Sequence, residues 1–339
     1  MPRLGVQNFR GIRSLEAQLG QVNIIVGQNA CGKSSLLQAL DVLLGASSRP
    51  SRQGVEQYFS AKHANSLVTQ DERECRLFFE DAPTSIAVVL RSVGHGAVER
   101  AMGESWQPLI LNPERSALTR PVVFDVSARL APNGEGLADV VADFDDEKRA
   151  RVVQFVKWAN PRVAEILTQR VEVHERVLVE MQDGSEHSAS RKRGSGYQLQ
   201  VREVGGIRLN ADALSDGTLW AIALGAALQH APATQSVMLL IDDLDRDLHP
   251  QAQFEVARAL REVVKSNPKL SLVATAHSPF LLNAFEANEV FAMLRSAGTG
   301  PSVLRPLSEH PEWKKWSEQL EPGEFWSWKQ ESWVASGAA

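Results

Sequence analysis

The feature that most restricts the fold of this chain is a glycine-rich turn between an apolar run and a helical pattern. Residues 22–26 (VNIIV) are apolar and mostly β-branched, which is typical of a buried strand. Residues 36–44 (LLQALDVLL) place leucines at helical spacing. The turn between them, residues 27–34 (GQNACGKS), satisfies the pattern GxxxxGK[ST] in full. This order predicts a P-loop α/β fold, and the alternative is a chance glycine-rich turn.

The loop predicts a cradle for nucleotide phosphates. Its glycines allow the backbone to curl, so that successive N–H groups point inward at the start of a helix and bind phosphate oxygens. We expect the Lys33 ammonium to reach the β- and γ-phosphates and the Ser34 hydroxyl to ligate Mg²⁺, so the expected cofactors are ATP and Mg²⁺. The predicted nucleotide contacts in this segment are Gly27, Asn29, Ala30, Cys31, Gly32, Lys33, Ser34 and Ser35.

An acidic pair follows another apolar run, within residues 237–245 (VMLLIDDLD). In a P-loop protein the carboxyl end of such a strand faces the phosphates. Asp242 is therefore expected to hold Mg²⁺ through water, and Asp243 to orient or deprotonate the attacking water. An acidic turn after a core strand is the plainer alternative. The pairs Asp243/Asp245 and Asp245/Asp247 also fit a two-metal nuclease centre, which needs a further acidic residue on a separate strand.

Composition limits the class of protein. Of the 339 residues, 43% are hydrophobic and 23% charged, which is ordinary for a globular protein. Neither a membrane-spanning run nor an apolar secretory segment is recognisable. The two cysteines, Cys31 and Cys75, are too few for a disulfide framework or a four-ligand zinc site. We therefore expect a cytoplasmic protein with no membrane partner, and the net charge of −5 restricts nucleic-acid contact to a local basic patch.

A third motif makes the comparison with known families specific. Residues 214–218 (LSDGT), followed by a long apolar helical pattern, resemble the signature motif of ABC-type ATPases in the form typical of the RecF- and OLD-like group. Residues 241–250 (IDDLDRDLHP) and 273–282 (VATAHSPFLL) resemble the same group, as does the opening segment with its P-loop. The matches cover residues 2–45 and 205–294, in the order that the group has.

The resemblance implies an ABC-type ATPase head with a mostly parallel sheet, additional antiparallel strands and an inserted helical and β lobe. It also implies a head-to-tail dimer that encloses two ATP molecules. Ser215 and Gly217 of one subunit would then face the γ-phosphate held by Lys33 of the other. A helix N-terminus that opens at Ser215 suits that task. The resemblance further implies that His277 senses the γ-phosphate, whereas a capping or core histidine is the plainer alternative.

One position departs from the group's pattern. The residue after the Mg²⁺ aspartate is normally glutamate, and here it is Asp243, whose side chain is one methylene shorter. We therefore expect slow turnover, so that the protein acts more as an ATP-held clamp than as a motor. The glutamine that reports Mg²⁺ in this group is not assignable, because Gln53, Gln57 and Gln70 lie in one polar segment.

The expected domain organisation is discontinuous. Residues 1–45 and 205–300 are the ATPase core, and residues 46–204 supply additional β-strands and an inserted helical lobe, with helices over 145–168. Residues 301–339 form a tryptophan-rich tail.

A basic segment, residues 184–196, and the tryptophan-rich tail each allow more than one interpretation. Residues 184–196 are predicted to be a polar loop in which Arg191-Lys192-Arg193 either contacts a phosphate backbone or forms a solvated hairpin tip. A helical tail packed on the ATPase core is the plainer interpretation of residues 301–339. We nevertheless predict that Trp326, Trp328 and Trp333 help to hold a partner or a neighbouring subunit.

The resemblance also suggests a biological role. Related stand-alone ATPases are often the sensor or regulatory subunit of bacterial anti-phage defence systems, with an effector encoded nearby, and others serve DNA repair of the RecF type. The expected partners are a second copy of the chain and such an effector, with nucleic acid as a further candidate. A weakly hydrolysing scaffold that restrains a toxic partner is an alternative. A transporter head is a further one, which the LSDGT sequence disfavours.

Overall fold

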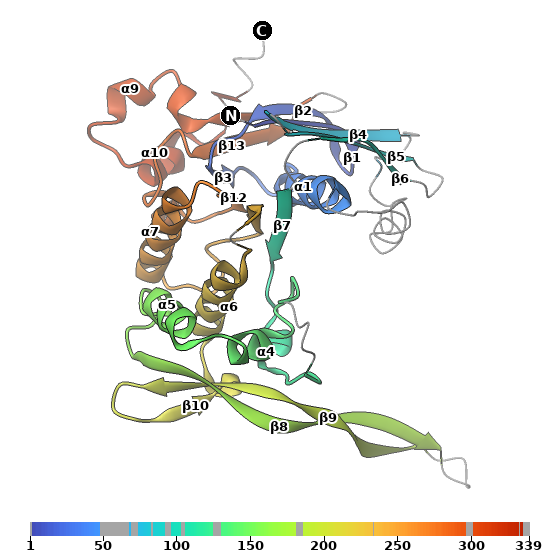
Figure 1. Ribbon diagram of the computed structural model, residues 1–339. Coiled ribbons are helices and arrows are strands. Elements are labelled where there is room, and N and C mark those ends of the chain that lie inside the picture. The colour runs from blue at the N-terminus through green and yellow to red at the C-terminus, as the bar shows by residue number, and fades with distance from the viewer. Residues whose placement is uncertain are drawn as a thin grey trace. The chain divides into compact units, whose positions relative to one another are not determined.

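The structure is a computed structural model (Figure 1). It describes residues 2–47, 68, 74–82, 84–91, 96–102, 106–124, 130–180, 186–232, 234–295, 301–331 and 333–334. The chain divides into two compact units. Unit 1 comprises Met1–Ile110, Pro232–Arg246 and Gln253–Ala339, and unit 2 comprises Leu111–Ala231 and Asp247–Ala252. None of the helices in the described part of the chain is long and apolar enough to cross a bilayer.

The first sheet of unit 1 has the strand order β14-β13-β3-β12-β11-β7. Strands β13, β3, β12 and β11 run parallel to one another, and β14 is antiparallel to β13. Every residue of β3, β12 and β11 is buried, as is usual for parallel strands covered on both faces. The bounds are β3 (Val22–Val26), β7 (Trp106–Leu111), β11 (Ser236–Ile241), β12 (Leu270–Thr275), β13 (Val290–Arg295) and β14 (Ser302–Pro306).

The second sheet of unit 1 is antiparallel, in the order β2-β1-β4-β5-β6. Its strands are β1 (Arg3–Phe9), β2 (Ile12–Gln18), β4 (Glu74–Asp81), β5 (Thr84–Arg91) and β6 (Gly96–Met102). Helix α1 (Lys33–Ser47) contacts strands of both sheets and lies between them in Figure 1. Leu36, Leu40 and Leu43 of α1 are fully buried in the hydrophobic core that joins the two sheets. The expected α/β fold with a mostly parallel sheet and additional antiparallel strands is confirmed.

Helix α7 (Pro250–Ser266) is fixed to the segment before β13 by ion pairs. The Glu289 carboxylate is buried, and its two oxygens lie 2.6 Å from Arg261 Nε and 2.8 Å from Lys265 Nζ. Two cations around one buried carboxylate offset the cost of removing that charge from water.

The C-terminal segment belongs to unit 1 and packs there through helix α10 (Pro322–Lys329). This helix contacts α8 (Pro279–Leu282), and the Gly323 N–H donates to Asn283 Oδ1 at 2.8 Å. A Cβ at Gly323 would lie 1.9 Å from the Pro279 carbonyl oxygen, so the contact requires glycine.

The aromatic side chains of this segment pack mainly against one another. Phe325 is fully buried and Trp326 is buried, whereas Trp328 is 53% exposed. Trp333 lies 5.0 Å from the ring of His310. The prediction that three tryptophans face a partner is therefore wrong for Trp326, and it stays a prediction for Trp328 and Trp333.

In its described residues, unit 2 combines a long hairpin with several helices. The hairpin strands are β8 (Val163–Glu180) and β9 (Glu186–Glu203), and the short β10 (Arg208–Asn210) pairs with β9. Helices α3, α4 and α5 contact α6, and α4 and α5 also contact the hairpin. The helices are α3 (Arg115–Thr119), α4 (Leu137–Ala142), α5 (Asp146–Val156), α6 (Asp216–His230) and the 3₁₀ turn Ala211–Ala213.

Two segments of unit 2 differ from the sequence prediction. Helix α5 ends at Val156 and β8 begins at Val163, so the helix expected over 145–168 is wrong in its second half. The loop expected over 184–196 is wrong as well, because β9 begins at Glu186. Pairing of β8 with β9 along their whole length explains why each segment is a strand. Ion pairs such as that between Lys192 and Glu172 add contacts across the two strands.

Candidate functional site

The glycine-rich loop leaves β3 and ends where α1 begins, at Lys33. Gly27 and Gly32 have φ values of 151° and 112°, and Ala30 also has a positive φ of 63°. A Cβ at Gly27 would lie 2.4 Å from the Met293 carbonyl oxygen, so this position needs glycine both for its conformation and for the close approach of β13. The loop therefore has the tight curl that a phosphate cradle requires.

The Lys33 side chain folds back over the start of the loop. Its Nζ donates to the carbonyl oxygens of Gly27 at 2.9 Å and Gln28 at 3.1 Å. The side chain is buried, with 7% of its surface exposed. The ammonium group is thus held at the loop, and its contact with the β- and γ-phosphates stays a prediction.

The first helical turn meets the acidic end of β11. Ser34 Oγ donates to Asp242 Oδ1 at 3.1 Å, and Thr275 Oγ1 donates to the same oxygen at 2.7 Å. Thr275 Oγ1 also accepts from the Asp243 N–H at 2.8 Å. A hydroxyl and a carboxylate oxygen are donors that Mg²⁺ prefers, so Ser34 and Asp242 fit the predicted metal ligands.

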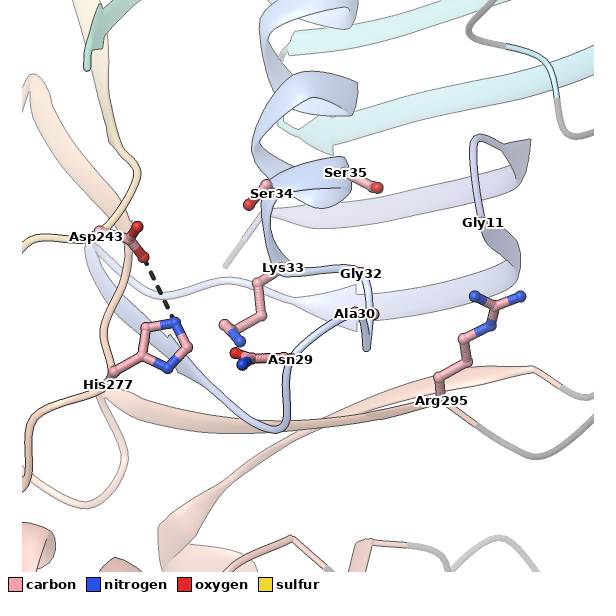
Figure 2. Close-up of a pocket in the computed structure, with 10 residues that line it drawn as sticks. All are labelled: Gly11, Asn29, Ala30, Gly32, Lys33, Ser34, Ser35, Asp243, His277 and Arg295. Carbon is pink, nitrogen blue, oxygen red and sulfur yellow. Dashed lines mark ion pairs between the residues drawn. The ribbon is translucent and has the colours of Figure 1, made fainter. Parts of the chain in front are cut away.

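The side chain of Asp243, the residue after Asp242, faces that of His277. His277 Nε2 lies 3.5 Å from Asp243 Oδ1 (Figure 2). Asp243 has a φ of 55°, a left-handed conformation that costs energy in a non-glycine residue. Burial and the adjacent Asp242 carboxylate raise the pKa of Asp243, against the opposing effects of His277 and Lys33. A carboxylate of raised pKa beside the predicted phosphate site is chemically suited to accept a proton from water.

The backbone of His277 is fixed by Asp245. Its N–H donates to Asp245 Oδ2 at 3.1 Å, and the Asp245 carbonyl accepts from Gln253 Nε2 at 3.0 Å. Asp245 therefore serves the position of the histidine, and Asp247 belongs to unit 2. Among the described residues, no group of three or more His, Cys, Asp or Glu side chains is arranged to hold a metal ion, so a nuclease centre built on these aspartates gains no support.

A cavity of about 440 Å³ opens at this place. Its lining includes Asn29, Ala30, Gly32, Lys33, Ser34, Ser35, Asp243 and His277, together with Gly11 and Arg295. In Figure 2, Asp243 and His277 lie on one side of the loop, and Gly11 and Arg295 lie on the other. The Cys31 side chain is buried, and burial raises the pKa of its thiol.

Three residues of this site were not expected from the sequence. Thr275 is the last residue of β12, and Gly11 and Arg295 come from the β1–β2 turn and the end of β13. A Cβ at Gly11 would lie 3.1 Å from Arg295 Nη1, so glycine leaves room for the guanidinium. Thr275 could have been found from the sequence because, like Asp242, it stands at the end of an apolar strand.

The signature residues lie in unit 2, at the N-terminus of α6. Ser215 is the N-cap, and its Oγ accepts from the Thr218 N–H at 3.3 Å. A Cβ at Gly217 would lie 2.7 Å from the Asp247 carbonyl oxygen, so Gly217 allows these segments to pack closely. The cavity described above is lined by residues of unit 1.

Comparison with known proteins finds similarity in two segments of the chain, one with the glycine-rich loop and one with the LSDGT motif and the acidic pair. Residues 1–91 match the family described as "AAA ATPase domain", and residues 179–283 match "AAA domain, putative AbiEii toxin, Type IV TA system". The Septu protein PtuA of Bacillus thuringiensis is 38% identical over 56 residues, 16% of this chain and 13% of that protein. The OLD nuclease of Thermus scotoductus is 42% identical over 45 residues, 13% of this chain and 8% of that protein.

These matches in sequence are short, whereas similarity of fold covers most of the chain. The matched segments span less than a fifth of the length of either relative. The Smc head domain of Pyrococcus furiosus, bound to the C-terminal domain of ScpA, superposes with a TM-score of 0.56 and 11% identity. The superposition covers 94% of this chain and all of that one (100%). At that identity the likeness shows the fold alone.

Proposed function

We propose that this chain is an ABC-type ATPase of the RecF/OLD-like group, which binds Mg·ATP in the described cavity and hydrolyses it when two copies associate head to tail. The observation that carries the proposal is the meeting of Ser34, Asp242 and Thr275 beside the phosphate loop. The Ser34 hydroxyl and the Asp242 carboxylate come from distant parts of the chain, and Ser34 Oγ lies 3.1 Å from Asp242 Oδ1.

In this proposal the Lys33 ammonium exchanges its two carbonyl partners for oxygens of the β- and γ-phosphates. Ser34 and Asp242 would hold Mg²⁺, which when bound would offset the negative charge of the phosphates. The Asp243 carboxylate accepts a proton from the attacking water, and its raised pKa favours that transfer. The His277 imidazole, 3.5 Å away, orients the carboxylate and faces the γ-phosphate.

The proposed activity is tested by Mg²⁺-dependent ATP hydrolysis of the full chain. Lys33→Ala removes the cation at the β- and γ-phosphates, so turnover should fall by about 100-fold or more and ATP binding should weaken. Lys157→Ala, at the exposed end of α5, is the matched control and should behave as wild type. Undiminished turnover in a folded Lys33→Ala protein would refute the site.

The proposed dimer completes each site with the signature motif of the other copy. Ser215→Arg places a long cation at the N-terminus of α6, so it should abolish turnover while each subunit still binds ATP. A mixture of Ser215→Arg and Lys33→Ala subunits should recover at most one working site per dimer. Turnover that is unaffected by Ser215→Arg would mean that α6 takes no part in hydrolysis.

We further propose that the chain is the sensor or regulatory ATPase of a bacterial anti-phage defence complex with a separate effector encoded nearby. The supporting observations are the local identities with the Septu protein PtuA and the OLD nuclease. A strain that carries the chain with its neighbouring genes should resist phage infection, and the same strain with Lys33→Ala should not. Equal plating of phage on both strains would count against this role. Co-purification of the wild-type chain from the resistant strain would then identify the effector.

A further inference from the structure

A single arginine of unit 2 holds the segment that leads into α6. Arg115, the first residue of α3, donates from Nη2 to the carbonyl oxygens of Asp212 at 2.7 Å and Leu214 at 3.0 Å. Its Nη1 donates to the carboxylate of Asp216. Leu214 and Ser215 are both extended, between the 3₁₀ turn and the helix. One guanidinium therefore bonds to the chain on both sides of Ser215.

The charge of Asp216 makes this contact relevant to phosphate binding. Asp216 is the first residue of α6, and Ser215 before it is exposed at the N-terminus of the helix. Free N–H groups and the helix dipole favour an anion at such an end. A carboxylate in the first turn occupies the same favourable field and repels a phosphate by like charge. The LSDGT form thus carries a charge that a glycine at the same position would not.

We infer that Arg115 compensates this charge, holding the Asp216 carboxylate aside and neutralising it so that the N-terminus of α6 accepts the γ-phosphate of the opposite subunit. The inference rests on the proposed head-to-tail site. Arg115 is a positioning residue here, because it acts through Asp216 and the two carbonyl groups rather than on the nucleotide.

The ion pair between Arg115 and Asp216 adds little to the stability of the fold. The side chains of Arg115 and Asp216 are 44% and 51% exposed, and ion pairs that exposed contribute little to stability. Substitution of Arg115 is therefore expected to change ATP turnover and ATP-dependent association more than it changes the unfolding midpoint. The cavity that binds ATP in a single subunit is lined by unit 1, so the ATP affinity of the monomer should stay the same.

The test compares Arg115→Ala, Asp216→Asn and the double variant in the full chain. Arg115→Ala leaves the carboxylate uncompensated, so turnover should fall by about 10- to 100-fold while monomer ATP affinity stays within about twofold. Asp216→Asn removes the charge at constant shape, so its turnover is the reference with which the double variant is compared. The double variant should recover most of the turnover, which a purely structural role of Arg115 or its direct contact with phosphate would not produce. Arg120→Ala, which breaks the exposed ion pair with Glu135 in the same segment, is the matched control.

The outcomes separate this inference from the proposed function. If Ser215→Arg abolishes turnover but Arg115→Ala has no effect, the inference fails and the composite site stands. Failure of Asp216→Asn to rescue Arg115→Ala also overturns the inference. If Ser215→Arg is fully active, the composite site itself fails. Should Arg115→Ala be unstable, Arg115→Gln removes the charge but keeps a donor for a carbonyl group, and the same rescue by Asp216→Asn is required.

Discussion

Replacing Thr275 by valine tests whether its hydroxyl supports both Asp242 and Asp243. The hydroxyl is fully buried, donates to Asp242 Oδ1 at 2.7 Å and accepts from the Asp243 N–H at 2.8 Å. Valine has nearly the same shape, so the change removes these two bonds and little packing. A hydrogen bond to an ionised group contributes about 1.5–3 kcal/mol, and an unpaired buried donor costs about 1–3 kcal/mol.

Asp242 and Asp243 are only half-buried, so water replaces part of the lost hydrogen bonding. The lower part of both energy ranges therefore applies. We expect Thr275→Val to lower the free energy of unfolding by about 2–4 kcal/mol. Thr275→Ser keeps both bonds and removes one buried methyl group, so it should cost only about 1 kcal/mol.

Urea denaturation of both variants gives the difference in free energy, and Mg²⁺-dependent hydrolysis shows its effect on the site. Turnover should fall in the valine variant, because the left-handed backbone at Asp243 loses the bond that its N–H makes. Equal stability and equal turnover of the valine and serine variants would show that the hydroxyl supports neither carboxylate.

Asp243→Asn should keep Mg·ATP binding and accumulate an ATP-bound dimer in size-exclusion chromatography, because only the base is lost; a persistent monomer would contradict this. Burial raises the pKa of Asp243, so turnover should decline with falling pH above the range of an ordinary aspartate. His277→Gln removes a group that lowers this pKa and should move the decline to still higher pH. Cys31 is buried with a raised thiol pKa, so alkylation should be slow and equal with and without ATP; protection by ATP would argue otherwise. Phe325→Ala should lower the free energy of unfolding by about 3–5 kcal/mol and the exposed Trp328→Ala by less than about 1 kcal/mol; the reverse order would show that the tail is not core.

The phosphate loop and the acidic strand were predictable because their chemistry is local. Consecutive backbone groups form the loop, and its glycines are required by their own φ values and by the approach of β13. Asp242 and Asp243 follow directly on an apolar strand, which in a parallel sheet puts them at the edge where the other strands also end. The fold class was predictable from the same alternation of strand and helix.

The hairpin of unit 2 was less predictable because its stability comes from pairing. Residues 184–196 are polar, basic and rich in glycine and serine, which locally favours a loop. In the structure, Lys192 pairs with Glu172 and Arg193 with Glu175, each on the facing strand. Strand propensity depends on such cross-strand neighbours, and a single stretch of sequence does not contain them.

The sequence by itself determined where the glycine-rich loop forms, which strand carries the acidic pair, and that the two belong to one α/β fold. Tertiary structure alone decided which other side chains join them. β12 lies between β3 and β11 in the sheet, so Thr275 at its end lies between the phosphate loop and Asp242. Arg295 reaches the loop because β13 is the neighbour of β3 on the other side. The physical reason is that strand order is set by packing across the whole sheet, whereas the conformation of the loop is set by its own backbone.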